Sequence, residues 1–190
     1  ALKKEKIAPY KIKAKEGLSL INGTQVMLAI GSHSLLQAKS LLSLSDKIAA
    51  LSYEALDAHI DPLHPNIHKA RKQKGQIETA KNLRQELKGS YLYKKKTHPR
   101  VQDPYSLRCV PQVHGPCKDA FSFVKGIIEN ELNAVTDNPI IFPSSKRIIS
   151  GGNFHGQYLA LAFDTAAIAF SELASISERR LELLLNPQFS

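Results

Sequence analysis

The chain has 190 residues, 43% of them hydrophobic, which is enough apolar material for one substantial core and excludes disorder over the whole chain. The formal net charge of +9 comes from lysines and arginines that cluster without any nucleic-acid-binding signature, so we expect solvated surfaces and no nucleic-acid partner. No window holds about 18 unbroken apolar residues and the N-terminal stretch has no signal-peptide core, so we expect a cytoplasmic protein without a membrane span.

Residues 1–90 predict a charged N-terminal segment followed by helices. A turn is expected at Asn22 and Gly23, in "LINGTQV", and a long helix after it, because apolar residues recur at helical spacing within residues 18–59. The Asp-Pro stretch at residues 61–65 is expected to stop this helix. A shorter helix is predicted over residues 76–87.

The middle of the chain predicts a loop and then two helices. The tyrosine and lysine run from Ser90 to Arg100 indicates a loop or an extended crossing. Asp103 followed by Pro104 favours a helix start, since an Asp side chain can cap free amides and proline fits the first helical turn. A further helix is predicted over residues 118–132.

The last part of the chain predicts a small hairpin and one long helix. Two short β-branched runs, Ile140 to Phe142 and Arg147 to Ile149, flank a Pro-Ser-Ser-Lys turn, which is typical of a β-hairpin. After Gly152 the chain is dense in Ala and Leu as far as Asn186, which predicts a helix buried among other helices. We therefore expect a mainly α fold, a bundle of long helices with irregular loops and a hairpin near 140–149, built from residues 1–90 and 91–190 as one structural unit.

Three polar side chains lie three residues apart in "VQDPYSLRCVPQVH". If Pro104 opens a helix, Tyr105 and Arg108 share one face and Gln102 lies beside them. A guanidinium matches the two oxygens of a carboxylate, and a phenol can give or accept a proton. A buried tyrosine and an arginine that pairs with a nearby acid explain the same spacing, and from spacing alone this structural explanation is favoured.

Other polar stretches give weaker signals. In "ISGGNFHGQ" two glycines precede Asn153, Phe154 and His155 at the start of the long apolar helix, where close backbone approach and negative charge are favoured. A turn with Asn153 as the helix cap explains them equally well. His114, in "PQVHGP", either orients the Gln-Tyr-Arg segment or caps a turn.

No metal site is expected. Three histidines lie close together in the sequence, but Pro65 interrupts their helical geometry and no acidic or cysteine partner completes a ligand set. The spacing of Cys109 and Cys117 fits neither a redox pair nor a zinc site, so both are expected as free thiols.

Five stretches, in this order, resemble the aromatic amino-acid ammonia-lyases, in particular the histidine enzymes of that family: "LINGTQ", "QDPYSLRCVPQVHG", "ELNAVTDNP", "ISGGNFHG" and "SISERR". The resemblance runs from about Lys15 to Asn186, and His114 before Gly115 is what looks like the histidine enzymes. It implies an L-aspartase-like all-α fold and a homotetramer in which each active site draws residues from three subunits. The implied reaction removes ammonia from L-histidine and gives trans-urocanate.

The resemblance also implies roles for individual residues. Arg108 would bind the substrate carboxylate, and Asn22 would help to hold that group or the electrophile. Tyr105 would assist proton movement beside the departing amine, Gln102 would hydrogen-bond in the same pocket, and Phe154 would pack near the substrate. The family's electrophile is 4-methylidene-imidazol-5-one, made autocatalytically from an Ala-Ser-Gly triplet.

One departure from the family pattern sets a limit. The chain has no Ala-Ser-Gly triplet, since the Ser-Gly pair at 150–151 follows Ile149. We therefore expect an internal portion of such an enzyme, inactive by itself. A phenylalanine or tyrosine ammonia-lyase, an aminomutase, and a noncatalytic helical scaffold or binding domain remain as alternatives.

Overall fold

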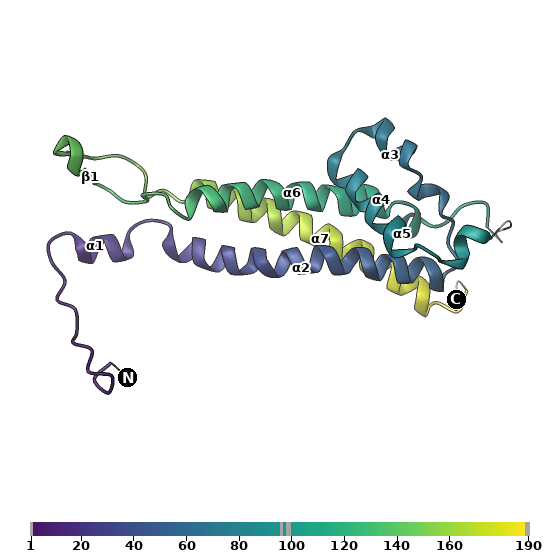
Figure 1. Ribbon diagram of the computed structural model, residues 1–190, viewed down its shortest axis with the longest axis horizontal. Helices are drawn as coiled ribbons and strands as arrows, with labels where there is room; N and C mark the ends of the chain where they lie inside the picture. Colours follow the sequence, from purple (N-terminus) through teal and green to yellow (C-terminus); the bar gives the residue numbers. More distant parts are fainter. Residues whose placement is uncertain (1, 96, 98–99, 189–190) are drawn as a thin grey trace.

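A computed structural model describes residues 2–95, 97 and 100–188 of the chain (Figure 1). Three long helices, α2 (Gln25–Ala55), α6 (Val110–Glu131) and α7 (Gln157–Leu185), lie side by side as a bundle. The shorter α4 (Lys74–Glu86) packs against α6 at one end of the bundle, and α1 (Glu16–Ile21) and the β-hairpin lie at the other. The predicted mainly α fold with a small hairpin is confirmed.

Helix α2 follows the predicted turn but ends earlier than predicted. Gly23 has φ 108°, and a Cβ there would lie 1.9 Å from the Thr136 carbonyl oxygen, so the turn needs glycine. The helix ends at Ala55 because Asp57 adopts a left-handed φ of 54°, and Ala58 N–H then donates back to Tyr53 O at 2.9 Å. This helix end usually carries a glycine, so an aspartate gave no sequence signal.

The Asp-Pro stretch begins new elements. It forms a 3₁₀ turn, η1 (Asp61–Leu63), and then Pro65 opens α3 (Pro65–Arg71). The His64 ring accepts a hydrogen bond from Asn66 N–H at 3.3 Å, and proline is well suited to the first helical position. The expectation that this stretch stops the long helix was wrong, since that helix has already ended before it.

A helix does start after Pro104, and the helix that follows it is longer than predicted. Helix α5 (Tyr105–Arg108) is a single turn, and Pro104 occupies its N-cap position. The Asp103 carboxylate does not cap it but accepts hydrogen bonds from His59 N–H at 2.6 Å and from the Arg100 guanidinium at 3.3 Å. Helix α6 begins at Val110, well before the predicted start at residue 118, although prolines lie at positions 111 and 116.

The hairpin agrees with the sequence prediction residue for residue. Strand β1 (Ile140–Phe142) pairs antiparallel with β2 (Arg147–Ile149), and η3 (Pro143–Ser145) forms the turn. The predicted loop after Ser90 contains one 3₁₀ turn, η2 (Tyr91–Lys94), and residues 96, 98 and 99 of that loop lie outside the described residues.

The core lies mainly where α2, α4, α5 and α7 meet. Its largest cluster of buried residues includes Tyr53, Leu83, Leu107, Val110 and Leu183. Helices α4 and α6 approach closely there, since a Cβ on Gly115 would lie 2.5 Å from the backbone nitrogen of Gln76. The two halves of the sequence therefore share one core.

Helix α7 is only partly covered, which corrects the expectation of a helix buried among others. Its buried apolar residues include Leu159, Leu173 and Ile176. Ile168, by contrast, is 68% exposed, and other apolar residues of α7 are similarly exposed to solvent. In the described part of the chain, α7 alone is long and apolar enough to cross a membrane, with 22% of its most apolar window buried. Core helices of soluble proteins have the same length and composition, so this observation is weak evidence for a span.

Candidate functional site

The residues singled out in the sequence lie at two opposite ends of the bundle. Gln102, Tyr105 and Arg108 lie on and before α5 at one end, which we call the α5 end (Figure 1). Asn22 and residues 153–155 lie beside α1 and the β-hairpin at the other, which we call the hairpin end. Helix α2 connects the two ends, and at about 1.5 Å per residue its 31 residues span roughly 45 Å. One copy of this chain therefore does not bring all of these residues into one pocket.

At the α5 end, the tyrosine and arginine lie together as predicted. The Arg108 guanidinium carbon lies 4.9 Å from the centre of the Tyr105 ring, a cation–π distance. Arg108 Nε donates to Asp103 O at 3.2 Å, and within the described residues its terminal nitrogens make no hydrogen bond. Tyr105 is 73% exposed. A planar cation and a phenol are thus presented on one surface.

The sequence predicts one pocket for Gln102, Tyr105 and Arg108, but in the structure they line two adjoining hollows. Gln102 and Arg108 line one together with His59, while Tyr105 lines the other between α5 and α7. Both hollows include Cys109, which directly follows α5. Gln102 is therefore near the arginine but does not share a hollow with the tyrosine.

At the hairpin end, Asn22 is held by one carboxylate. Its Nδ2 donates to Asp137 Oδ1 at 3.0 Å, and the same carboxylate accepts from Lys15, from Ser19 Oγ at 2.8 Å and from Asn138 N–H at 2.7 Å. These contacts, above all the one with Lys15, hold the pKa of Asp137 well below its usual range. Asn22 is thereby fixed with its amide nitrogen toward Asp137.

The stretch before α7 is exposed, and Gly156 occupies the N-cap position of the helix without a side-chain cap. His155 Nδ1 accepts a hydrogen bond from Gln157 N–H at 3.2 Å, at the start of α7. Asn153 instead donates to Val135 O at 3.4 Å, so the alternative in which Asn153 caps the helix is wrong. Phe154 is 43% exposed, and its chain neighbours Asn153 and His155 line a hollow together with Val135.

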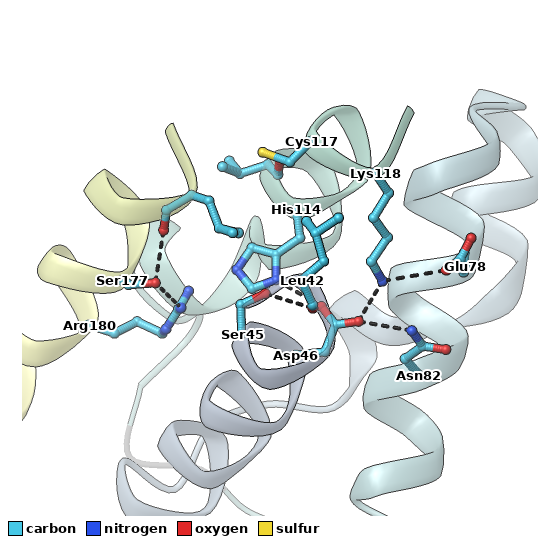
Figure 2. Close-up of polar contacts among 12 residues, drawn as sticks. Leu42, Ser45, Asp46, Glu78, Asn82, His114, Cys117, Lys118, Ser177 and Arg180 are labelled. Atoms are coloured by element: carbon cyan, nitrogen blue, oxygen red, sulfur yellow. Dashed lines mark hydrogen bonds and ion pairs between the residues drawn. The ribbon is translucent and has the colours of Figure 1, made fainter. Parts of the chain in front are cut away.

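His114 belongs to the protein interior and contacts neither the Gln-Tyr-Arg segment nor a turn. It is fully buried in α6, and its Nδ1 lies 2.9 Å from Asp46 Oδ1 (Figure 2). The other Asp46 oxygen accepts from Lys118 and from Asn82 at 2.9 Å, and Lys118 also lies 3.9 Å from Glu78. This buried cluster joins α2, α4 and α6.

The protonation states in the cluster follow from burial and contact. Burial opposes the charge of Asp46, but hydrogen bonds from His114, Lys118 and Asn82 outweigh it and hold the pKa of Asp46 below its ordinary value. Burial lowers the pKa of His114, although the contact with Asp46 acts in the opposite direction. A neutral His114 therefore carries its proton on Nδ1 and donates it to Asp46.

Sequence reasoning did not find Asp46 or Lys118. The available signal was a charged residue at a position where the helical pattern calls for an apolar one, since Leu42 and Ala50 lie one turn on either side of Asp46 and both are buried. Nothing in the pattern alone says whether such a residue serves packing or chemistry.

Among residues 2–95, 97 and 100–188, no three His, Cys, Asp or Glu side chains are grouped so that they could hold a metal ion. His68 is buried, with its ring nitrogens 3.0 Å from Pro62 O and 3.0 Å from Gln76 Nε2. Cys109 and Cys117 are free, as predicted, and burial raises the pKa of Cys117 to about 11, so it stays a thiol.

Comparison with known proteins identifies the family to which this bundle and its polar motifs belong. The model of the aromatic amino acid lyase family matches residues 1–190. The chain belongs to that family.

Similar curated relatives are histidine ammonia-lyases. The enzyme of Anaeromyxobacter dehalogenans is 50% identical over 193 residues, which cover 100% of this chain and 38% of the relative. Histidine ammonia-lyase 2 of Fusobacterium nucleatum is 51% identical, covering 100% of this chain and 37% of the relative. The chain thus spans a little over a third of the length of these relatives.

Solved structures show the same fold. Histidine ammonia-lyase from Trypanosoma cruzi has a TM-score of 0.88 and 44% identity, covering 100% of this chain and 35% of that one. Phenylalanine aminomutase from Pantoea agglomerans has a TM-score of 0.93 and 31% identity, covering 100% of this chain and 40% of that one.

Proposed function

We propose that this chain is part of a histidine ammonia-lyase, which eliminates ammonia from L-histidine to give trans-urocanate in the cytoplasm. One observation carries the proposal: two histidine ammonia-lyases are 50% and 51% identical to it over its whole length. The exposed Arg108–Tyr105 pair supplies chemistry that suits an amino-acid substrate.

At the α5 end, the proposed roles follow from donor geometry. Arg108 binds the substrate carboxylate, because its terminal nitrogens can make two parallel hydrogen bonds to two oxygens. Tyr105 lies against the same guanidinium and accepts or returns a proton near the amine, while Gln102 hydrogen-bonds to the bound substrate beside Arg108.

We propose that the pocket at the α5 end is completed by residues from the hairpin ends of other copies of the chain. Asn22 and Phe154 lie roughly 45 Å from α5, the length of α2, so a pocket containing all the proposed residues needs several subunits, and we propose a homotetramer. With its nitrogen toward Asp137, Asn22 offers its carbonyl oxygen to the pocket, and Phe154 offers an exposed ring.

The proposed cofactor is 4-methylidene-imidazol-5-one, formed from an Ala-Ser-Gly triplet that this chain does not contain. When bound, it supplies an electrophile that makes the amine a better leaving group. An amide oxygen, an exposed aromatic ring and a phenol fit the surroundings of a small planar group, and the proposed roles of Asn22, Phe154 and Tyr105 are to surround and orient it.

In the experiment, the full-length enzyme is incubated with L-histidine, and the formation of urocanate is measured by its ultraviolet absorbance. Arg108→Ala is expected to raise KM about 10- to 100-fold, since a charge-assisted contact contributes roughly 1.5–3 kcal/mol. Arg71→Ala removes an exposed arginine on α3 and serves as the matched control. A normal KM in Arg108→Ala would refute the carboxylate role.

An aminomutase or a lyase for phenylalanine or tyrosine is the second candidate, favoured by the TM-score of 0.93 to the Pantoea agglomerans enzyme. It is separated by substrate and product: such an enzyme would turn over phenylalanine or tyrosine, and an aminomutase would yield a β-amino acid. The absence of turnover with any of these amino acids would indicate a noncatalytic helical scaffold.

A further inference from the structure

The short helix α5 cannot hold its position through its own hydrogen bonds. It has four residues and is separated from α6 by Cys109, the C-cap of one helix and the N-cap of the other. Pro111 has no N–H, so the Leu107 carbonyl lacks the donor that a continuing helix would provide. A buried carbonyl without a donor is costly, and other side chains must supply one.

Tyr53 supplies the donor for Leu107. It lies on α2, is fully buried, and its hydroxyl donates to Leu107 O at 2.7 Å. Burial raises the pKa of Tyr53 far above its usual range, so the hydroxyl keeps its proton and remains a donor. The contact joins residues 54 positions apart and fixes α5 from the side of α2.

Arg180 acts from the other side, on the neighbouring carbonyl. It lies on α7 and is 1% exposed, and its Nη1 lies 3.4 Å from Ser106 O. Its Nη2 donates to Ser177 Oγ at 3.0 Å (Figure 2). Burial lowers the pKa of Arg180 to about 10, so it is still a cation at neutral pH. A buried guanidinium with no ion pair to a carboxylate in the described part of the chain needs such carbonyl contacts.

We propose that Tyr53 and Arg180 are positioning residues that hold α5 between α2 and α7 and thereby set where Arg108 and Tyr105 meet the substrate. They bind the two consecutive carbonyls, of Ser106 and Leu107, that lie between those side chains in the sequence. This inference rests on the proposed function for its kinetic consequence, whereas the placement of α5 itself can be measured independently.

The first test uses Tyr53→Phe in the full-length enzyme, which keeps the ring and removes only the hydroxyl. We expect kcat/KM for L-histidine to fall about 10- to 100-fold with a raised KM, because a displacement of about 1 Å can cost that much. Tyr91→Phe is the matched control: the Tyr91 hydroxyl also donates to a backbone carbonyl near the end of α2, Glu54 O at 2.9 Å, but does not contact α5. It is expected to change kcat/KM less than about twofold.

The second test compares Arg180→Met with Arg180→Lys. Lysine keeps the charge and a donor, so it is expected to recover part of the loss seen with methionine. Arg84→Met is the matched control, since Arg84 donates to Leu63 O and has no contact with α5. Recovery by lysine with unchanged thermal midpoints would separate positioning from a general loss of packing.

A readout that does not depend on turnover is the labelling rate of Cys109, which directly follows α5 and is half-buried. A displaced α5 is expected to change the rate of thiol labelling at Cys109 several-fold, located by peptide mass mapping, while the buried Cys117 stays slow. The inference is overturned if both Tyr53→Phe and Arg180→Met keep the wild-type rate of Cys109 labelling and the wild-type kcat/KM and KM. If the wild-type enzyme has no ammonia-lyase activity but the Cys109 rates change, the proposed function fails and the anchoring of α5 stands.

Discussion

The α5 end and the hairpin end of the bundle differ in what holds their polar side chains. At the α5 end, the backbone beside Arg108 is held by Tyr53 and Arg180, which are almost completely buried. At the hairpin end, Asn22 is held by Asp137 in a partly exposed cluster, and Ile148 in the hairpin is 70% exposed. Buried contacts are not screened by water and fix geometry strongly, whereas exposed ones contribute little.

The two ends also differ in how much apolar surface one copy of the chain buries. The α5 end contains the largest buried cluster, so its surface is already defined in one copy. The hairpin end presents large apolar side chains to solvent, as does much of α7, and this surface is what the proposed homotetramer would cover.

The largest expected effect comes from breaking the buried cluster near the α5 end. Asp46→Ala is expected to lower the free energy of unfolding by about 3–5 kcal/mol, because it leaves the Lys118 charge buried without its partner. Glu129→Ala, which removes an exposed ion pair with Lys125, is expected to cost only about 0.3–0.5 kcal/mol. Urea unfolding measures both, and equal losses would contradict the contrast.

A smaller effect is expected where α4 and α6 cross. Gly115→Ala places a Cβ 2.5 Å from the Gln76 nitrogen and is expected to cost about 1–3 kcal/mol through overpacking. Gly126→Ala, on the same helix, meets no atom within 4 Å and is expected to stabilise by about 0.5–1 kcal/mol. The midpoint of urea unfolding is expected to fall in Gly115→Ala and to rise in Gly126→Ala, and shifts in the same direction would contradict this.

Acidification should weaken the α5 end. The folded pKa values of His114 and Asp46 both lie below their unfolded values, so on lowering the pH the unfolded state takes up protons first and stability is lost. The loss begins below about pH 6.5 through His114, continues below about pH 4 through Asp46, and is at most about 1.4 kcal/mol per pH unit for each proton. Buried His68 adds in the same sense.

The pH effect is measured by urea unfolding at pH 7, 6 and 5. His114→Gln is expected to flatten the dependence, while His33→Gln, on the exposed face of α2, should leave it unchanged. An unaltered slope in His114→Gln would show that this histidine does not titrate on unfolding.

The smallest effect on overall stability is expected at the hairpin end. Asp137→Ala removes the acceptor shared by Lys15, Ser19 and Asn22, so residues 13–24 should be cleaved several-fold faster by trypsin while the urea midpoint stays the same. Ser145→Ala in the hairpin turn serves as the control. A lowered urea midpoint in Asp137→Ala would mean that the two ends are more alike than their burial indicates.

Much of the secondary structure could be predicted because its signals are local. The hairpin strands at residues 140–142 and 147–149 were predicted residue for residue, since β-branched runs and a Pro-Ser-Ser-Lys turn specify them. The start of α6 was missed because Pro116 lies inside the helix, where a proline normally argues against one, whereas Pro111 fits the first turn; packing of α6 on α4 and α7 supports the helix despite Pro116.

The candidate site was predictable in part. The pairing of Tyr105 and Arg108 depends only on helical spacing, and the structure confirms it. The contact of Asn22 with Asp137 joins residues 115 positions apart, and the burial of His114 against Asp46 joins residues 68 apart, so no local pattern could indicate either.

The sequence by itself determined the helical class, the hairpin and the membership of the aromatic amino acid lyase family, because these depend on local periodicity and on motifs several residues long. Only the tertiary structure decided that the proposed site residues lie at opposite ends of one bundle, and that Tyr53 and Arg180 hold α5. Those facts depend on which distant side chains meet in the core, where burial makes each unpaired polar group costly and so selects one arrangement.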